Sequence, residues 1–212
     1  MSFETRWSSL KRVAPDVSRE TVERLTDLES FFSKWAKTIN LVAPSTIDDA
    51  WNRHFLDSAQ LWRWRGSTSS WLDLGSGSGF PALVLAVLSS DEALPTTLVE
   101  SNLKKSAYLK QAISHLGLNA KVLTQRVEQL DARLFEVPHV TVTARAFAPL
   151  ERTLDWTNGF GSPATRALLH KGRDYQSELA QLHGRWRFDL VERPSLVDSA
   201  SVILDITAAE RL

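Results

Sequence analysis

The residues best suited to chemistry are three glycines in the segment WLDLGSGSGFPALVLAVL, residues 71–88. A short apolar run leads into Gly75, Gly77 and Gly79, and a helical pattern opens at about Pro81, whose fixed φ suits a first helical turn. Glycines at such a junction let the chain turn sharply and bring backbone amides against a ligand at a helix N-terminus. The segment predicts a loop that binds an adenosine-type cofactor. The alternative is a tight βα turn in a domain without a cofactor.

Two acids bear on which cofactor this would be. Glu100 ends the next predicted strand, about 20 residues after Gly79, where a carboxylate accepts the hydroxyls of a ribose. Asp73 precedes the loop, and an acid there repels a pyrophosphate but can take the ammonium end of a methionine moiety. The spacing G-x-G-x-G also departs from the dinucleotide fingerprint G-x-G-x-x-G. The loop therefore favours S-adenosylmethionine (SAM) over NAD.

A further cofactor contact is expected from RVEQL, residues 126–130, directly after the third predicted strand. There Val127 can cover an adenine ring, and Glu128 or its backbone can meet the exocyclic amine. The alternative is that Glu128 is a solvated loop acid.

Arg145 lies in TARAFAPL, residues 143–150, at the end of the fourth predicted strand, where an open parallel sheet binds its ligands. It can bind a target base, a phosphate or the SAM carboxylate; alternatively it is a structural arginine paired with an acid. The segment has no general base and no N-P-P-Y motif of the kind that grips an exocyclic amine. This favours a ring nitrogen such as guanine N7, which loses no proton on methylation, so that Arg145 acts by positioning.

The elements that must position these residues follow from periodicity. Apolar residues recur at helical spacing from Val22 to Ile39, with Ser18 placed to cap, and again from Ile47 to Trp64, with Thr46 and Asp49 as a capping pattern. Beyond the linker RGSTSS, short apolar runs alternate with helical patterns, as in βαβ units. We expect strands near 71–74, 96–100, 120–123, 140–143, 167–170, 186–191 and 202–206, and helices near 81–88, 104–116, 150–157 and 175–182.

These elements predict an α/β protein with the Rossmann-like fold of SAM-dependent methyltransferases. The sheet has seven mostly parallel strands, and the last strand is antiparallel because the short connection 192–201 leaves no room for a helix. Residues 1–66 form an N-terminal helical extension that packs on the core, and residues 67–212 form the methyltransferase domain.

Composition excludes several classes of function. The 212 residues include no cysteine, which rules out disulfides, cysteine-based zinc sites and RNA methyltransferases that attack a pyrimidine through a thiol. His54 has no second histidine at ligand spacing, so we expect no metal. No signal peptide and no long apolar stretch is present, which predicts a cytoplasmic protein without a membrane partner.

The formal net charge is zero, with 25 basic and 25 acidic residues, which argues against an indiscriminate nucleic-acid binder. Local charge is uneven, however. Residues 101–127 hold no acid but include Lys104, Lys105 and three further bases, residues 145–173 are also basic, and residues 174–212 are acidic. A basic cluster can be a solvated helix face, but two beside a cofactor site favour one folded RNA site.

Taken together, these segments resemble the RsmG (GidB) family, bacterial methyltransferases that modify guanine N7 in 16S rRNA. The matching pieces are KWAKTINLV (34–42), RHFLDSAQL (53–61), LDLGSGSGFPA (72–82), LVESNLKKSAYL (98–109), RVEQL (126–130), RAFAPL (145–150) and HKGRD (170–174). The departures are Ser78 for a proline, Ala82 for a glycine, Glu100 for an aspartate and Gln129 for a glutamate.

The resemblance implies SAM binding through Gly75, the Phe80 turn, Val127 with Glu128, and Arg145. It implies substrate contacts from the Lys171-Gly172 turn and from four residues of the second helix: Arg53, His54, Asp57 and Ser58. From the residues alone, the i, i+4 pairs in this helix segment are ordinary helix-face partners.

We expect the partner to be 16S rRNA or the small ribosomal subunit, with the chain acting as a monomer without an obligate protein partner. Two other functions stay open from the sequence. One is a SAM methyltransferase acting on a small molecule or a protein, and the other is a non-catalytic adenosine-nucleotide binding domain.

Overall fold

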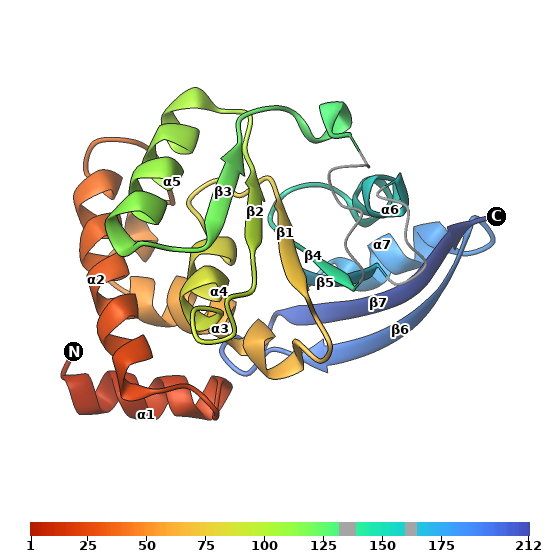
Figure 1. Cartoon of the computed structure of the whole chain (residues 1–212). Helices are drawn as coiled ribbons and strands as arrows, with labels where there is room; N and C mark the ends of the chain where they lie inside the picture. The colour runs from red at the N-terminus through yellow and green to blue at the C-terminus, as the bar shows by residue number, and fades with distance from the viewer. Residues whose placement is uncertain (132–138, 160–164) are drawn as a thin grey trace.

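A computed structural model describes residues 1–131, 139–159 and 165–212. Its described strands form one seven-stranded sheet in the order β3-β2-β1-β4-β5-β7-β6 (Figure 1). The strands are β1 Ser70–Leu74, β2 Thr96–Val99, β3 Ala120–Leu123, β4 Val140–Arg145, β5 Arg166–Lys171, β6 Trp186–Pro194 and β7 Val202–Arg211.

The direction of the strands agrees with the sequence prediction. Strands β3, β2, β1, β4 and β5 pair in parallel, whereas β7 runs antiparallel to both β5 and β6. All seven predicted strands occur, although β6 and β7 continue three and five residues past their predicted ends at 191 and 206. The Rossmann-like methyltransferase fold class is confirmed.

Each central strand buries both of its faces, and alternate residues enter two separate cores. On β5, Leu168 joins a cluster formed with the N-terminal helices, whereas Leu169 joins a cluster formed with α6 (Leu150–Gly159) and α7 (Tyr175–Leu182). The same alternation separates Ile203 from Leu204 on β7. Because side chains of a strand point alternately to opposite faces, an almost continuous apolar run builds a three-layer molecule.

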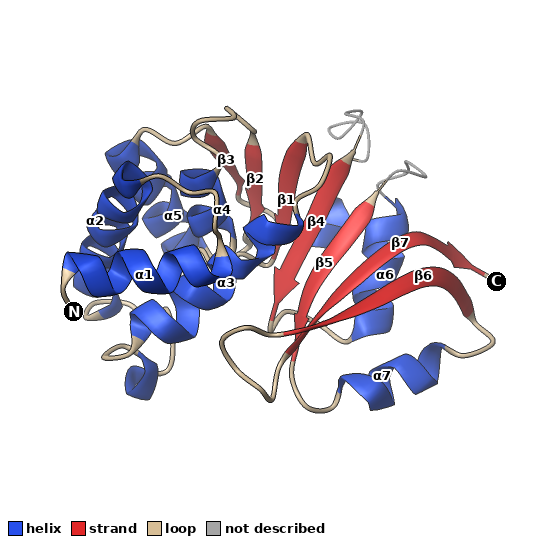
Figure 2. Ribbon diagram, turned by 90° about the horizontal axis from the view of Figure 1, so that it is seen from below, coloured by secondary structure: helices blue, strands red, loops and turns tan. Residues whose placement is uncertain are grey.

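The helices sit on the sheet as this alternation requires. Figure 2 shows α1 to α5 gathered toward the β3 end of the sheet and α6 and α7 toward the β6 end. Helix α4 (Ala82–Leu88) follows the glycine loop and is buried throughout, and α5 (Leu103–Leu116) is capped by the Asn102 side chain and ends at Gly117 in the left-handed region. None of the described helices has the length and apolar character needed to span a bilayer.

The N-terminal region has more helices than predicted. Helices α1 (Phe3–Val13) and α2 (Arg19–Ala36) are joined by a turn, and the Ser18 hydroxyl caps α2 by accepting from the Thr21 amide, as the sequence predicts. A short 3-10 turn, η1 (Pro44–Thr46), comes next.

The second predicted helix begins later than expected. It consists of a π-helical turn η2 (Trp51–Leu56), one turn α3 (Asp57–Ala59) and a 3-10 turn η3 (Gln60–Trp64). The capping pattern predicted for Thr46 is wrong, because its hydroxyl donates to the Ala43 carbonyl and closes η1 instead.

These N-terminal elements share a core with the sheet. The ring of Phe32 on α2 lies edge-on to Phe80, which follows the glycine loop, at 5.3 Å between centroids. Phe55 meets the same ring at 5.1 Å. The boundary near residue 66 stays a prediction, but the N-terminal helices complete the packing around the glycine loop.

Candidate functional site

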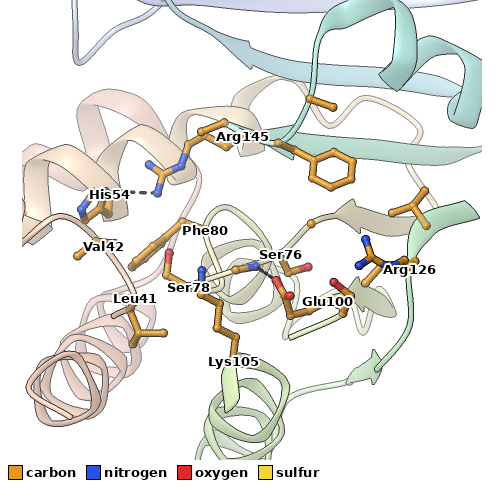
Figure 3. Close-up of a pocket in the computed structure, with 18 of the residues that line it drawn as sticks. Leu41, Val42, His54, Ser76, Ser78, Phe80, Glu100, Lys105, Arg126 and Arg145 are labelled. Carbon is orange, nitrogen blue, oxygen red and sulfur yellow. Dashed lines mark hydrogen bonds between the residues drawn. The ribbon is translucent and has the colours of Figure 1, made fainter. Parts of the chain in front are cut away.

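A pocket of about 830 Å³ opens at the carboxyl ends of β1, β2 and β4 (Figure 3). Its walls come from the N-terminal segment around η1 and η2, the glycine loop, the segments that follow β2 and β3, the β4–α6 loop, and helices α5 and α6. The residues discussed below that line it are Thr46, Arg53, His54, Gly75, Gly77, Phe80, Glu100, Lys105, Arg126, Val127, Glu128, Arg145, Phe147, Arg152 and Trp156.

The glycine loop has the backbone that its sequence predicts. Gly75, Gly77 and Gly79 all adopt positive φ, at 66°, 53° and 87°. A Cβ on Gly75 would lie 2.0 Å from the Phe147 ring, and one on Gly79 would lie 2.4 Å from Leu83. Gly77 is different, because a Cβ there meets nothing nearer than 3.6 Å. Gly75 and Gly79 are therefore required by packing, and Gly77 only by its backbone conformation or by a ligand.

Glu100 lies in the pocket and binds the loop itself. One carboxylate oxygen accepts from the Gly77 amide at 2.8 Å, and the other accepts from the Asn102 amide at 2.7 Å. Both contacts fix the carboxylate just after β2, and Figure 3 shows Glu100 at the floor of the pocket beside the glycine loop. Each oxygen can still accept a second hydrogen bond. Glu100 is therefore held in a fixed orientation and remains able to accept from a hydroxyl donor of a ligand.

Asp73 does not line the pocket but lies buried just behind it, at 1% exposure. One carboxylate oxygen accepts from the Thr143 hydroxyl at 2.6 Å, whereas the other has no hydrogen-bond partner. Burial raises the pKa of Asp73 to about 6, opposed mainly by the hydrogen bond from Thr143. A buried acceptor without a donor is costly, and a cationic ligand group would relieve that cost.

Val127 and Glu128, the residues predicted to contact an adenine, both lie at the pocket. Val127 is buried and lines the pocket, and the exposed Glu128 also lines it while pairing with Arg152 at 2.9 Å. The sequence analysis missed Phe147 and Trp156, whose rings pack together at 5.2 Å on the same side. The aromatic in RAFAPL was a visible signal for the first of them, but their pairing depends on how the loop folds back.

Arg145 reaches from the end of β4 toward η2 and α3. It donates to the Asp57 carboxylate at 3.2 Å and to the Arg53 carbonyl at 3.3 Å, and Nη2 lies 3.3 Å from His54 Nδ1. The guanidinium also lies over the Phe80 ring, 5.3 Å from its centroid (Figure 3). Arg145 is therefore paired with an acid, as the structural interpretation expects, and it also lines the pocket, where binding of a ligand stays a prediction.

His54 is held as a neutral ring. Burial, reinforced by the Arg145 charge, lowers its pKa to about 4. Since an arginine only donates, Nδ1 is the acceptor from Arg145 and Nε2–H donates to the Thr46 hydroxyl at 3.0 Å. His54 thus connects Arg145 to η1, which forms the rim of the pocket.

Of the two i, i+4 pairs expected in this helix, only His54 with Ser58 makes contact, through the His54 backbone. Asp57 pairs with Arg145 and not with Arg53, and the Ser58 hydroxyl donates to the His54 backbone carbonyl. Ser58 is completely buried and does not line the pocket, and its contact with a substrate stays a prediction.

The predicted lysines lie in three different environments. Lys105 lines the pocket, whereas Lys104 is exposed at the start of α5 and lines no described pocket. Lys171 is mostly buried, and its ammonium donates to Glu178 at 2.7 Å and to the Ala148 carbonyl at 3.1 Å. Only Lys105 and Lys171 are therefore placed to meet a ligand near the strand ends.

A second pocket of about 690 Å³ adjoins the first one on the far side of Arg145. The two share the β4–α6 loop, residues 145–149, as a common wall. The second pocket is completed by the end of β5, with His170 and Lys171, and by Glu178 on α7. Strand register explains the arrangement, because Arg145 pairs directly with His170 across β4 and β5.

The described residues include no group of side chains suited to binding a metal ion. Within residues 1–131, 139–159 and 165–212, no three histidine, aspartate or glutamate side chains are grouped to hold an ion.

Comparisons with known proteins agree with this geometry. The sequence matches the GidB family, described as rRNA small subunit methyltransferase G, over residues 21–204. It is 46% identical to "Ribosomal RNA small subunit methyltransferase G" of Brucella canis, over all of this chain and 99% of that protein. The protein of the same name in Brucella anthropi is 45% identical over the same shares.

Solved structures share the fold at low sequence identity. A SAM-dependent methyltransferase from Aquifex aeolicus superposes with a TM-score of 0.57 at 14% identity, covering 82% of this chain and 97% of that one. The structure of M. jannaschii TYW2 in complex with AdoMet gives a TM-score of 0.51 at 16% identity, covering 84% and 80%.

Proposed function

The chain belongs to the GidB family, that of rRNA small subunit methyltransferase G, and on that premise we propose that it transfers a methyl group from SAM to N7 of one guanine in 16S ribosomal RNA. The observation that supports N7 is the hydrogen bonding around Arg145, which lies between the two pockets. His54 and Asp57, the two titratable side chains hydrogen-bonded to Arg145, both accept from it and are not free to take a proton. A ring nitrogen with a free lone pair requires no such base.

Three groups at the first pocket support SAM as its ligand. The unpartnered oxygen of Asp73 lies behind the glycine loop, where a cationic group of the ligand would satisfy it. The Glu100 carboxylate is held for ribose hydroxyls, and Val127 offers an apolar surface to an adenine. When bound, SAM supplies an electrophilic methyl group whose bond to sulfur breaks as the new bond to N7 forms.

The protein's part in this reaction is positioning. The Arg145 guanidinium is held on three sides and lies between the two pockets, where it can orient the SAM carboxylate, the guanine O6 or a phosphate. Its fixed fork suits such planar acceptors better than a flexible ammonium does. Aligning two reactants in this way is a large part of catalysis when no proton has to move.

The remaining substrate contacts follow from exposure. We assign RNA contacts to Arg53 and Lys105 at the rim of the first pocket, to Lys104 on the adjoining surface, and to Lys171 in the second pocket. The substrate is 16S rRNA or the small ribosomal subunit, and the chain acts as a monomer.

Two measurements test the proposal. First, SAM and NAD are compared for their effect on the melting temperature; stabilisation by SAM alone is expected, and stabilisation by NAD alone would refute the cofactor. Second, small subunits from a strain lacking this protein are incubated with methyl-labelled SAM. The label should appear in 16S rRNA at a base cleaved under conditions specific for 7-methylguanine, and label at any other atom would refute N7.

A further inference from the structure

The second pocket has a different charge character from the first one. Four ionised side chains line it, and they form two internal pairs, Arg145 with Asp57 and Lys171 with Glu178. His170 is buried, and burial lowers its pKa, so it adds no charge at neutral pH. The pocket is electrically balanced, and an anionic phosphate would have to break one of these pairs to gain a cation. A neutral, polar ligand is therefore the better occupant.

Glu178 is the side chain best placed to accept hydrogen bonds from such a ligand. Its Oε2 accepts from the Leu150 amide at 2.5 Å and from Lys171 Nζ at 2.7 Å, which fixes the carboxylate from two sides. Its Oε1 has no hydrogen-bond partner among the described residues, and the side chain keeps 27% exposure. Asp57 offers no comparable acceptor, because its two oxygens already accept from Gln60 and Arg145.

The chemistry of guanine matches this arrangement. Guanine has N7 and O6 on one edge, and N1–H and the 2-amino group, both donors, on the edge away from N7. If N7 faces the first pocket, the two donors face away from it, toward the part of the second pocket where Glu178 lies. The Lys171 ammonium beside Glu178 is a donor suited to O6.

We propose that the second pocket receives the target guanine and that Glu178 selects it by accepting from N1–H and the 2-amino group. This inference rests on the proposed function and adds the origin of its base specificity. Phe147 lines both pockets and gives the base an aromatic surface on the shared wall. Adenine, which presents an acceptor at N1 and no 2-amino group, would leave the carboxylate unpaired.

The experiment compares guanosine with inosine, which differs only by lacking the 2-amino group. Wild-type protein and methyl-labelled SAM first locate the methylated nucleotide in small-subunit RNA. Two ligated RNAs are then made that differ only in carrying guanosine or inosine at that position. We expect the wild type to prefer guanosine by about 10- to 100-fold in kcat/KM, the range for one hydrogen bond to a charged acceptor.

The variant Glu178→Gln should bring this preference close to unity. Its amide oxygen would face the Leu150 amide and Lys171, which leaves the NH₂ group, a donor, where the guanine donors need an acceptor. Melting temperature and SAM affinity are measured on the same variant to show that it is folded. Glu210→Gln, which removes an ion-paired carboxylate on β7 outside both pockets, is the matched control and should keep the wild-type preference.

The outcomes separate the two claims. If the wild type labels no guanine, the proposed function fails. If it labels guanine and Glu178→Gln discriminates against inosine as strongly as the wild type, the proposed function stands and the role of Glu178 is overturned. A loss of rate on both RNAs with an unchanged ratio also overturns it, because a merely structural role would produce that result.

Discussion

The two pockets share one wall and use their charges in opposite ways. Five cationic and two acidic side chains line the first, whereas in the second each cation has its own acid. Lys105, Arg126 and Arg53 form no ion pair with any described residue. The charged residues of the first pocket are Arg53, Glu100, Lys105, Arg126, Glu128, Arg145 and Arg152.

This difference shows how a chain of zero net charge can act on RNA. Cations without partners attract a polyanion to the rim of the first pocket. In the second pocket the paired charges add no net attraction, but their fixed hydrogen-bonding groups can orient a bound base. The attraction of RNA and the selection of the target base thus take place on opposite sides of the β4–α6 loop. Arg145 lines both pockets, so a substitution there should affect both.

Arg145→Ala should have the largest effect, because it removes the residue common to both pockets. We expect methyl transfer to fall by at least about 100-fold, the usual result of misaligned reactants. Stability should fall by about 1–3 kcal/mol, because Asp57 is left mostly buried without its partner. Radiolabel transfer to small subunits and thermal melting measure the two quantities.

The control for Arg145→Ala is Arg193→Ala. Arg193 forms a part-buried pair with Asp205 outside both pockets, so this variant should keep its activity. Its loss of stability should be smaller, because Asp205 keeps its second partner Arg166. Full activity of Arg145→Ala would remove this residue from the site.

Gly77→Val should affect the first pocket alone. The protein leaves room for a Cβ there, so the cost to the fold is the strain of a branched residue at φ of 53°, about 1–2 kcal/mol. A ligand resting on the loop has no such room, and we expect SAM affinity, measured by calorimetry, to fall at least about 100-fold.

Gly184→Val is the matched control for this variant. Gly184 has a φ of 74° and open space around it in the turn after α7, so the backbone strain is similar. Equal SAM affinity in the two variants would show that the loop does not hold the cofactor.

The success of the sequence analysis was greatest where the signal is local. The strands, the Ser18 cap and the sharp turn at the three glycines depend on residues within a few positions of one another, and each was predicted. The choice of Arg145 also succeeded in placing it at the pocket, because strand ends of a parallel sheet meet at one edge.

What the sequence did not reveal depends on contacts between distant segments. The partner of Arg145 is Asp57, 88 residues earlier, and its strand neighbour is His170. No local pattern announces either one. The π-helical turn was also not predicted, because local spacing indicated a regular helix. The sequence singled out Asp57, Arg145 and Lys171 separately, but it gave no indication that they line one pocket.

The ionisation of Asp73 should make SAM binding to the first pocket depend on pH. Burial raises its pKa from 3.8 to about 6, so the free fold prefers the neutral acid and loses stability as pH rises between those values. A cationic ligand group prefers the ionised form, so SAM affinity should rise about tenfold from pH 5 to pH 7. His54, whose pKa is about 4, stays neutral over this range.

Calorimetry at several pH values checks this expectation, with Asp73→Asn as the comparison. The variant should bind SAM more weakly at pH 7 and with a flat pH profile. Its stability relative to the wild type should be lowest near pH 4, where the wild type gains from binding a proton. A wild-type pH profile that persists in Asp73→Asn would assign the effect to another group.

The smallest effect concerns salt. Lys105 has no ion partner among the described residues, so each phosphate it neutralises releases counterions, and Lys105→Ala should reduce the slope of log K against log salt by about 0.7. Lys171 already pairs with Glu178, so Lys171→Ala should leave this slope nearly unchanged. Filter binding of small-subunit RNA between about 50 and 200 mM salt measures both slopes. If both lysines change the slope equally, the ion pair opens when RNA binds, and the second pocket attracts phosphate as the first one does.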